Sequence, residues 1–445
     1  MAAKRARYKT YVYYSYQLLV GLVFWTLFPV LLLVILITGK HRQGLFQRLG
    51  VQRIPRRLSK PGPRLWVHAA SIGEIQVAGV LIEYLTKAWP DVSIVVSTMT
   101  LQGRDFARTR FTDVDCFLAP LDVPLVVDWV LFRVDPDVYI CLETELWPLL
   151  IQKINRSGRG SVLLNGRISD RSVASYQRLT AVFQPVIASF NVIGAISEKD
   201  GERFFSLGAQ RLKIEVTGNL KYDPLLKAPG AGTSRNWRAS LGIAEGAPVV
   251  VAGSTHDPEE QVLLETIAWC NRQATTALWL IAPRHLDRLP EIKRLFARHS
   301  ISFQLLSQCL QTGRKERLIV VDTLGDLGQL YSVATVAFIG GSLCNYGGHN
   351  MFEAAVWQVP VLFGPHTQNF QVEAEALVAA GGAVRVAGSR ELCSALQLLV
   401  NDQGAYQRAA QAAGAVVARQ RGAGKHQLEL VRRVLNEQFP PGSLY

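Results

Sequence analysis

The sequence predicts an α/β protein with two Rossmann-like domains facing a cleft, preceded by an N-terminal membrane helix. Short apolar runs alternate with helical patterns in two series, which is typical of parallel sheets with right-handed crossovers. A stretch from Lys221 with two prolines and little periodicity separates the series, as a linker would. We therefore expect a membrane anchor in residues 1–45, a first domain in 46–225, and a second in 226–445 whose C-terminal helices pack back.

Each predicted strand is a short apolar run bounded by turn residues. In the first series, strands are expected at 65–69, 93–98, 137–143, 161–166, 191–197 and 212–219. In the second series, they are expected at 248–254, 277–283, 301–306, 318–323, 334–341, 360–365 and 382–388. Because helical patterns separate the strands, both sheets are expected to be parallel.

The N-terminal apolar stretch runs from Leu18 to Thr38 without a charge, and roughly 20 such residues suffice to cross a bilayer. Basic residues lie on both sides of it, and more of them follow than precede it. By the positive-inside rule, the main body is expected on the cytoplasmic side. Pro29 within the stretch allows a kinked helix, so a spanning and a monotopic anchor both remain open.

The composition narrows the choice of partners. The chain has 445 residues, 49% of them apolar, which is enough for two well-filled cores. The net charge of +13 favours acidic partners such as anionic lipid or a phosphorylated substrate. Nucleic acid is the weakest of these, because no zinc-finger spacing or aromatic RNA-binding signature occurs. The six cysteines are scattered without a C-x-x-C pair, which indicates a reducing compartment and no disulfides.

Two nucleotide-binding motifs are missing from the sequence. No G-x-G-x-x-G follows a predicted strand, and GAGKH from Gly422 lacks the earlier glycine and the Ser or Thr of a P-loop. The dehydrogenase and NTPase classes thereby lose their strongest signals. The eight histidines have no metal-binding spacing, so we expect neither a metal nor a cofactor.

Glu74 stands in the first turn of a predicted helix, just past the strand at 65–69, in the run HAASIGE. One interpretation is a helix start, because Ser71 and Glu74 have the spacing of a capping box. The other is a ligand site, because open α/β sheets bind ligands outside the carboxyl ends of their strands. Gly73 would leave room for such a ligand.

Polar and glycine-rich turns follow several strands of the second series. Backbone N–H groups at a helix start can hold an anion, and an arginine can grip phosphate or carboxylate. A capped helix and a surface loop are the structural alternatives for the first two turns. The candidate residues are Ser254 and Thr255 in AGSTHDPEE, Arg284 and His285 in IAPRHLDR, Gly341, Ser342, Gly348, His349, Asn350 and Glu353 in GGSLCNYGGHNMFEAA, and Asn369 in GPHTQNF.

The first series has charged clusters at two further strand ends. CLETELWP places Glu143 and Glu145 after one strand, and NGRISDRS places Arg167 and Arg171 after the next. Opposed acidic and basic groups suit a polar acceptor molecule, while ordinary ion pairing explains such clusters equally well.

Taken together, these strings resemble the 3-deoxy-D-manno-octulosonic acid (Kdo) transferases of lipopolysaccharide assembly. The matching stretches are HAASIGE, ETELWP, NGRISDRS, TGNLKYD, AGSTHDPEE, APRH, GGSLCNYGGHNMFEAA and GPHTQNF, and they span nearly the whole chain beyond the apolar stretch. Two departures are Ala354, where the family usually has proline, and Gly166, where it often has alanine.

The resemblance implies a GT-B glycosyltransferase of the bacterial inner membrane. It would transfer Kdo from CMP-Kdo, bound by the second domain, to a tetraacyldisaccharide 4′-phosphate lipid A precursor (lipid IVA), bound by the first. Glu74 matches the family's catalytic acid–base residue, and single displacement would invert the anomeric centre. No metal would be needed, because the leaving group has a single phosphate. The implied acceptor-binding residues are Ser71, Gly73, Glu143, Glu145, Arg167 and Arg171.

Two other classes remain open from the sequence. One is another membrane-associated GT-B transferase with a diphosphate sugar donor, which competition of CMP against UDP would separate. The other is a non-catalytic, membrane-anchored module that binds a sugar or nucleotide. Loss of turnover without loss of folding in Glu74→Ala would exclude that module.

Overall fold

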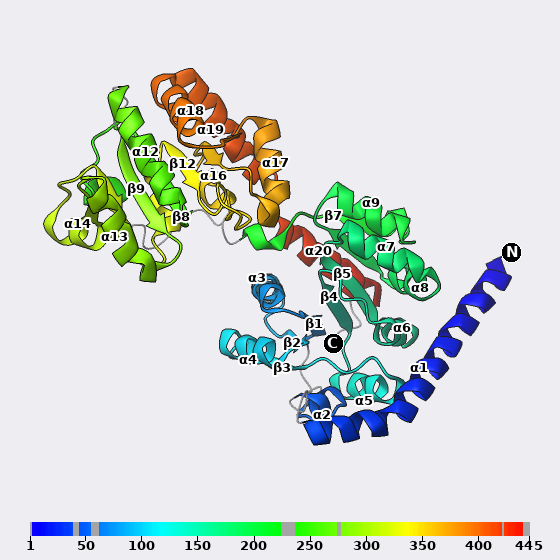
Figure 1. Cartoon of the computed structure of the whole chain (residues 1–445). Helices are drawn as coiled ribbons and strands as arrows, with labels where there is room; N and C mark the ends of the chain where they lie inside the picture. The colour runs from blue at the N-terminus through cyan, green and yellow to red at the C-terminus, as the bar shows by residue number, and fades with distance from the viewer. Residues whose placement is uncertain are drawn as a thin grey trace. The chain divides into compact units, whose positions relative to one another are not determined.

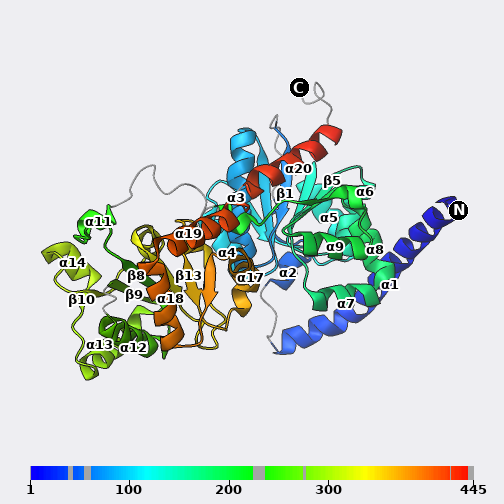
Figure 2. The ribbon, with the colours of Figure 1, turned by 90° about the horizontal axis from the view of Figure 1, so that it is seen from above.

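The computed structural model describes residues 2–38, 44–54, 62–223, 236–273, 277–420 and 422–438. The chain forms two compact units, one made of Met1–Asp223 with Gly422–Tyr445 and the other of Pro224–Arg421. Each unit is built on a seven-stranded sheet with helices packed around it (Figure 1, Figure 2). All strand pairs are parallel. The predicted α/β class is therefore confirmed.

The first sheet has the strand order β3-β2-β1-β4-β5-β6-β7. Its strands are β1 (Arg64–His68), β2 (Ser93–Thr98), β3 (Asp115–Leu118), β4 (Val138–Leu142), β5 (Gly160–Gly166), β6 (Val192–Ala195) and β7 (Ile214–Val216). The helices of this unit are α1 (Ala2–Thr38), α2 (Leu45–Arg48), α3 (Ile72–Ala88), α4 (Leu101–Arg110), α5 (Pro124–Val134), α6 (Pro148–Arg156), α7 (Asp170–Arg178), α8 (Thr180–Ser189), α9 (Glu198–Ser206) and α20 (Ala423–Gln438), with 3₁₀ turns η1 (Arg211–Lys213) and η2 (Leu220–Tyr222).

Successive residues of β1 point to opposite faces of the first sheet, as the two-residue period of a strand requires. Leu65 and Val67 enter one apolar core, and Trp66 enters the other. Every residue of β1, β4 and β5 is buried. These strands lie inside the sheet with helices on both faces, which explains their continuous apolar runs.

The second sheet has the strand order β10-β11-β9-β8-β12-β13-β14. Its strands are β8 (Val249–Thr255), β9 (Leu278–Pro283), β10 (Gln304–Leu305), β11 (Leu318–Val320), β12 (Val336–Ile339), β13 (Val361–Phe363) and β14 (Ala383–Arg385). Its helices are α11 (Trp237–Ser240), α12 (Glu259–Arg272), α13 (Leu289–Arg298), α14 (Leu306–Thr312), α15 (Leu327–Leu330), α16 (Phe352–Ala355), α17 (Gln371–Ala380), α18 (Ser389–Asn401) and α19 (Gln403–Ala418), with 3₁₀ turns η3 (Leu286–Arg288), η4 (Tyr331–Val333) and η5 (Gln368–Phe370).

One strand of the first sheet is not predicted from the sequence. β3 is the edge strand of the first sheet and has only four residues, beginning at exposed Asp115. Its apolar part is three residues long, which is too short to stand out as a buried run. Each of the other strands overlaps a predicted one.

The C-terminal helix α20 belongs to the first unit. Leu430, Val431, Val434 and Leu435 join the core that also holds Leu65. The sequence predicts a second domain over all of 226–445, with its C-terminal helices packing back. In the structure α18 and α19 belong to the second unit and α20 to the first. The predicted boundary between residues 225 and 226 falls within 224–235, outside the described residues.

The N-terminal helix α1 has 37 residues and contains Pro29. It packs beside α5 and α8 of the first unit (Figure 1). Within the described residues, no helix combines the length and apolarity needed to cross a membrane. The membrane anchor predicted for residues 1–45 stays a prediction, and positions 1 and 39–43 of it lie outside the described residues.

The placement of α20 predicts the effect of truncating one of its core side chains. Leu430 is fully buried against the first sheet, and Leu430→Ala should lower the free energy of unfolding of the first unit by about 2–5 kcal/mol. In calorimetric unfolding of the full chain, the transition of the first unit should move to a lower temperature. Leu212→Ala, at a side chain 96% exposed in the same unit, is the control and should leave that transition in place. A shift confined to the second unit would contradict the assignment of α20.

Candidate active site

Glu74 is held by the turn between β1 and α3. Ser71 is the N-cap of α3, and its hydroxyl oxygen accepts from the Glu74 backbone N–H at 3.3 Å. The same hydroxyl donates to Oε1 of Glu74 at 3.0 Å, and the Ala70 N–H donates to Oε2 at 2.8 Å. The expected pairing of Ser71 with Glu74 is therefore present. These bonds fix the direction of the carboxylate at the carboxyl end of β1.

The environment of Glu74 makes it a stronger base than an ordinary glutamate. The side chain is only 8% exposed, and burial raises the pKa of its carboxyl above the ordinary 4.5, while the bonds from Ala70 and Ser71 oppose that rise. Gly73 leaves open space beside it, because a Cβ at that position would meet only the Ser71 hydroxyl at 3.8 Å. A substrate atom can therefore approach this edge of the turn.

Two further carboxylates lie near Glu74 at the end of β4. Burial raises the pKa values of Glu143 and Glu145, and the charge of Glu74 raises both further. The charge of Arg167 acts in the opposite direction on Glu143. Glu143 has a φ of +56°, in the left-handed region that a non-glycine residue rarely adopts. Such backbone strain is concentrated at functional turns.

The basic residues predicted for the acceptor lie on the next segment. Arg167 follows β5 and is exposed, and its carbonyl accepts from the Thr144 hydroxyl in the turn after β4. Arg167 is thereby tied to the same edge as Glu143. Arg171 is exposed in the first turn of α7, whose N-cap is Ser169. The structure brings together Glu74, Glu143, Glu145 and Arg167, and it places Arg171 on the adjoining helix.

His68 lies beneath this edge and was not assigned a role from the sequence. Its Nδ1 is 2.8 Å from the Ser97 hydroxyl, and burial lowers its pKa to about 4, so the ring is neutral at neutral pH. Its ring stacks on that of Tyr139 at a centroid distance of 6.4 Å. His68 therefore forms part of the buried floor below the carboxylates.

The second unit gathers its predicted residues on the loops after β8, β9, β12 and β13. The backbone N–H of Arg284 donates to the backbone carbonyl of Thr255 at 3.0 Å, and this bond joins the ends of β8 and β9. The Gly348 N–H donates to the Gly341 carbonyl at 2.8 Å within the loop after β12. The Asn369 N–H donates to the Gly347 carbonyl at 2.9 Å, which brings in the segment after β13. These bonds assemble most of the predicted donor residues at one edge of the sheet.

Two histidines meet at the centre of these loops. Nε2 of His256 and Nε2 of His349 are 2.9 Å apart, so one ring donates to the other. Burial, together with the charges of His256 and Arg284, lowers the pKa of His349 to about 4. Burial also lowers the pKa of His256, and the charge of His285 lowers it as well. Both rings are therefore neutral at neutral pH, and Arg284 is exposed beside them.

The loop that leads to His349 ends in the short helix α16. The Asn350 side chain accepts from the Phe352 N–H at 3.1 Å and so forms an Asx turn just before the helix. Glu353 lies half-buried in its first turn. Tyr346 of the same loop stacks on His256 with ring centroids 4.2 Å apart. Aromatic rings, neutral imidazoles and an exposed guanidinium offer stacking and anion binding together.

Several predicted donor residues are already bonded within the protein. The Thr255 hydroxyl donates to Oε1 of Glu260 at 2.8 Å, and the side chain is fully buried. The Ser342 hydroxyl donates to the Ile339 carbonyl at 2.5 Å and accepts from the Gly364 N–H at 2.8 Å. Thr255 and Ser342 thus hold the loops in place. Ser254 has a φ of +55°, at the irregularity in the pairing of β8 with β9 between Gly253 and Thr255.

Two residues that hold these loops together, Glu259 and Glu260 in the run DPEE, were not predicted from the sequence. Glu260 accepts from Thr255 and from both terminal nitrogens of Arg288, at 3.0 and 3.2 Å. Glu259 accepts from four backbone N–H groups, three of them on the loop after β12. In the sequence, acidic residues in a first helical turn have an ordinary explanation in the helix dipole. Their near-zero exposure could be learned only from the structure.

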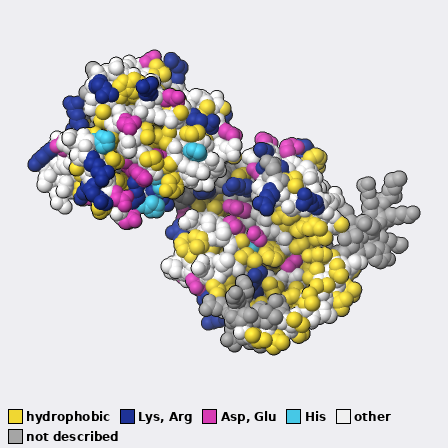
Figure 3. Space-filling model, in the orientation of Figure 1, with side chains coloured by type: hydrophobic (Ala, Val, Ile, Leu, Met, Phe, Trp, Pro, Cys, Tyr) yellow, Lys and Arg dark blue, Asp and Glu magenta, His cyan; other side chains and the backbone are white. Residues whose placement is uncertain are grey.

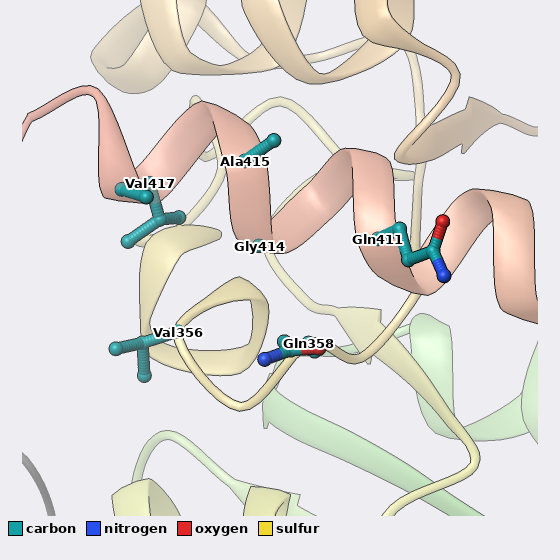
Figure 4. A pocket seen from close by; sticks show the side chains of 7 residues that line it. Val356, Gln358, Gln411, Gly414, Ala415 and Val417 are labelled. Carbon is teal, nitrogen blue, oxygen red and sulfur yellow. The ribbon is translucent and has the colours of Figure 1, made fainter.

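A shallow cavity of about 260 Å³ lies elsewhere in the second unit, between the end of α16 and α19 (Figure 4). Gly414 of α19 faces Gln358 there, and a Cβ on the glycine would lie 2.7 Å from that side chain. The lining includes Val356, Gln411, Ala415, Val417 and Ala418. None of the predicted site residues lines this cavity. Among the described residues, no group of three or more His, Cys, Asp or Glu could hold a metal ion.

Two parallel α/β units, with carboxylates at the strand ends of one and glycines, histidines and an arginine at those of the other, define a protein of the GT-B class. The same fold occurs in a UDP-GlcNAc 2-epimerase from Neisseria meningitidis, with a TM-score of 0.55 over 83% of this chain and 100% of that one. The sequences are 15% identical, so this likeness concerns the fold alone.

The family follows from sequence comparison. Residues 43–224 match the family model of 3-deoxy-D-manno-octulosonic-acid transferase (kdotransferase). A 3-deoxy-D-manno-octulosonic acid transferase from Haemophilus influenzae is 30% identical over 89% of this chain and 92% of its own. A bifunctional glycosyltransferase/methyltransferase from Fusobacterium nucleatum is 32% identical over 76% of this chain but 53% of its own. The chain belongs to the Kdo transferase family and is a glycosyltransferase.

The raised pKa of Glu74 predicts a pH dependence of stability. A carboxyl whose folded-state pKa exceeds its unfolded value adds stability below the unfolded pKa and loses it as the pH rises through the folded pKa. From pH 4 to pH 7 the wild type should therefore lose stability relative to Glu74→Gln, which does not titrate. Denaturant unfolding of both proteins across this range measures the difference. A difference that is constant with pH, or that grows in favour of the wild type, would contradict the raised pKa.

Proposed function

We propose that the protein transfers Kdo from CMP-Kdo to lipid IVA in lipopolysaccharide synthesis, with inversion at the anomeric carbon. The observation on which this depends is the buried carboxylate of Glu74, fixed by Ala70 and Ser71 beside the open space at Gly73. Membership of the Kdo transferase family supports the transferred sugar. The donor and acceptor are those that the family resemblance implies.

Glu74 acts as the general base in this proposal. An acceptor hydroxyl is a poor nucleophile, and its proton must leave as the new bond forms. The hydroxyl oxygen bonds to the ketosidic carbon of Kdo, the bond from that carbon to the phosphate oxygen breaks, and the proton passes to Glu74. The raised pKa of Glu74 makes it a better proton acceptor.

The loops of the second unit bind CMP-Kdo in this proposal. Arg284 is exposed and stands next to the neutral pair of His256 and His349. A guanidinium and imidazole N–H groups can stabilise the charge of the departing monophosphate. Glu353 would accept from the ribose hydroxyls. The single phosphate of the leaving group is why we expect activity without a metal.

We also propose that the first unit attaches to the bacterial inner membrane with its body on the cytoplasmic side. Apolar side chains gather on one face of this unit (Figure 3). On α5, Leu125, Trp129 and Phe132 are 66%, 48% and 69% exposed. The Arg133 guanidinium stacks on Trp129 at 5.7 Å. Aromatic and basic groups together suit the interface of an anionic membrane.

Analysis of the product tests the proposed function. The purified full-length protein should convert CMP-Kdo and lipid IVA into a product heavier by one or more Kdo units, as measured by mass spectrometry. Exhaustive EDTA treatment should leave the rate unchanged. Turnover lost to EDTA and restored by magnesium would contradict metal independence. Competition by UDP instead of CMP would favour a diphosphate sugar donor.

Replacing the proposed base separates catalysis from capping. Glu74→Gln keeps the size of the side chain but cannot accept the proton, so kcat should fall by about 10²–10⁴. Melting temperature should change little, since an N-terminal capping interaction is worth about 1 kcal/mol. Ser169→Ala, which removes the N-cap of α7, is the control for loss of a cap and should keep kcat within about tenfold. Near-normal turnover of Glu74→Gln with early melting would show that the residue only caps α3.

A further inference from the structure

Glu259 is a fully buried carboxylate in the first turn of α12. Its Oε2 accepts from the N–H groups of His256 at 3.0 Å and Gly341 at 2.7 Å. Its Oε1 accepts from the N–H groups of Ser342 at 3.0 Å and Leu343 at 2.9 Å. Both oxygens therefore bind two donors each, and the carboxylate joins the turn after β8 to the loop after β12.

The geometry of this loop calls for hydrogen-bond acceptors at its centre. Three successive N–H groups, from Gly341 to Leu343, donate to the two oxygens of one carboxylate and form a concave anion-binding nest. Gly341 has a φ of +67°, and a Cβ there would lie 3.1 Å from the His349 ring, so glycine is needed. Buried N–H groups need acceptors, and here Glu259 supplies them. Burial raises the pKa of its carboxyl, and the four N–H groups oppose that rise.

The two segments that Glu259 joins carry the histidine pair. The carboxylate binds the backbone of His256 directly. It also binds Gly341, whose carbonyl accepts from the Gly348 N–H next to His349. The two imidazoles meet at 2.9 Å only if both segments keep this spacing. Tyr346, stacked on His256, depends on the same arrangement.

We propose that Glu259 is a positioning residue of the donor site, which holds the two loops in register so that His256 and His349 share a hydrogen bond. The inference rests on the proposed function, since it takes these loops as the site that binds CMP-Kdo. One consequence concerns the phosphate. Because an internal carboxylate fills the nest, the phosphate of the donor must be bound by side chains such as Arg284 and not by the N–H groups of Gly341 to Leu343.

Glu259→Gln tests this role. The amide of glutamine directs an NH₂ group at donors that need an acceptor, so the loops should separate and the Kd for CMP should rise by about tenfold or more. Asp322→Asn is the control, because Asp322 also accepts from a backbone N–H of the second unit, that of Ser307 at 2.9 Å, but outside these loops. Isothermal titration calorimetry with CMP should show the loss in Glu259→Gln alone. Equal affinity in the wild type and Glu259→Gln would overturn the inference.

Histidine NMR gives a second measurement that does not need a ligand. In the wild type, the pKa of His349 should lie near the value of about 4 that its burial and neighbours produce. In Glu259→Gln it should move toward the ordinary 6.5, because the pair opens to water. A His349 that titrates near 6.5 in the wild type would overturn the inference even if the variant does not fold.

The two measurements also separate this inference from the proposed function. A wild type that fails to bind CMP, while its His349 titrates near 4 and Glu259→Gln raises that value, would contradict the CMP donor and support the role of Glu259. A wild type that binds CMP, while Glu259→Gln changes neither affinity nor the titration of His349, would support the donor and remove Glu259 from the site.

Discussion

Buried backbone N–H groups in the turns beyond parallel strands have no ladder partner and need another acceptor. In both units, carboxylates meet this need. Glu74 accepts from Ala70 after β1, Asp200 accepts from Ile168 after β5 at 3.0 Å, and Glu259 accepts from the loop after β12. Each of these hydrogen bonds fixes the backbone of a turn that would otherwise be flexible. Candidate site residues of both units, Glu74 in the first and Gly341 and Ser342 in the second, are carried by turns built in this way.

Glu74 and Glu259 both accept hydrogen bonds from backbone N–H groups, but their side chains differ in solvent exposure, and this difference gives them different roles. Glu259 is wholly enclosed, and both of its oxygens are saturated by backbone donors. Glu74 has fewer donors, keeps 8% exposure and adjoins open space at Gly73. A saturated carboxylate can only hold its surroundings. A carboxylate with an accessible edge and a raised pKa can also take a proton from a bound molecule.

Sequence patterns predicted much of this protein because strands and their terminal turns are local features. Apolar runs located the strands except β3, which is short and at an edge, and the turn from Ser71 to Glu74 formed as its spacing indicated. The return of α20 to the first unit depends on packing between distant segments. Glu259 was missed because three of its four donors lie 82 to 84 residues away. Thr255 and Ser342 were chosen by type, but burial turned their hydroxyls inward.

The two units differ in the electrostatics of their strand-end turns. In the first, burial and mutual repulsion raise the pKa values of Glu143 and Glu145 beside Glu74, which favours uptake of a proton. In the second, burial lowers the pKa values of His256 and His349, so these rings stay neutral and Arg284 supplies the positive charge for an anion. Glycosyl transfer releases a proton from the acceptor and an anion from the donor. Each unit thus has an electrostatic environment that suits one of these two products.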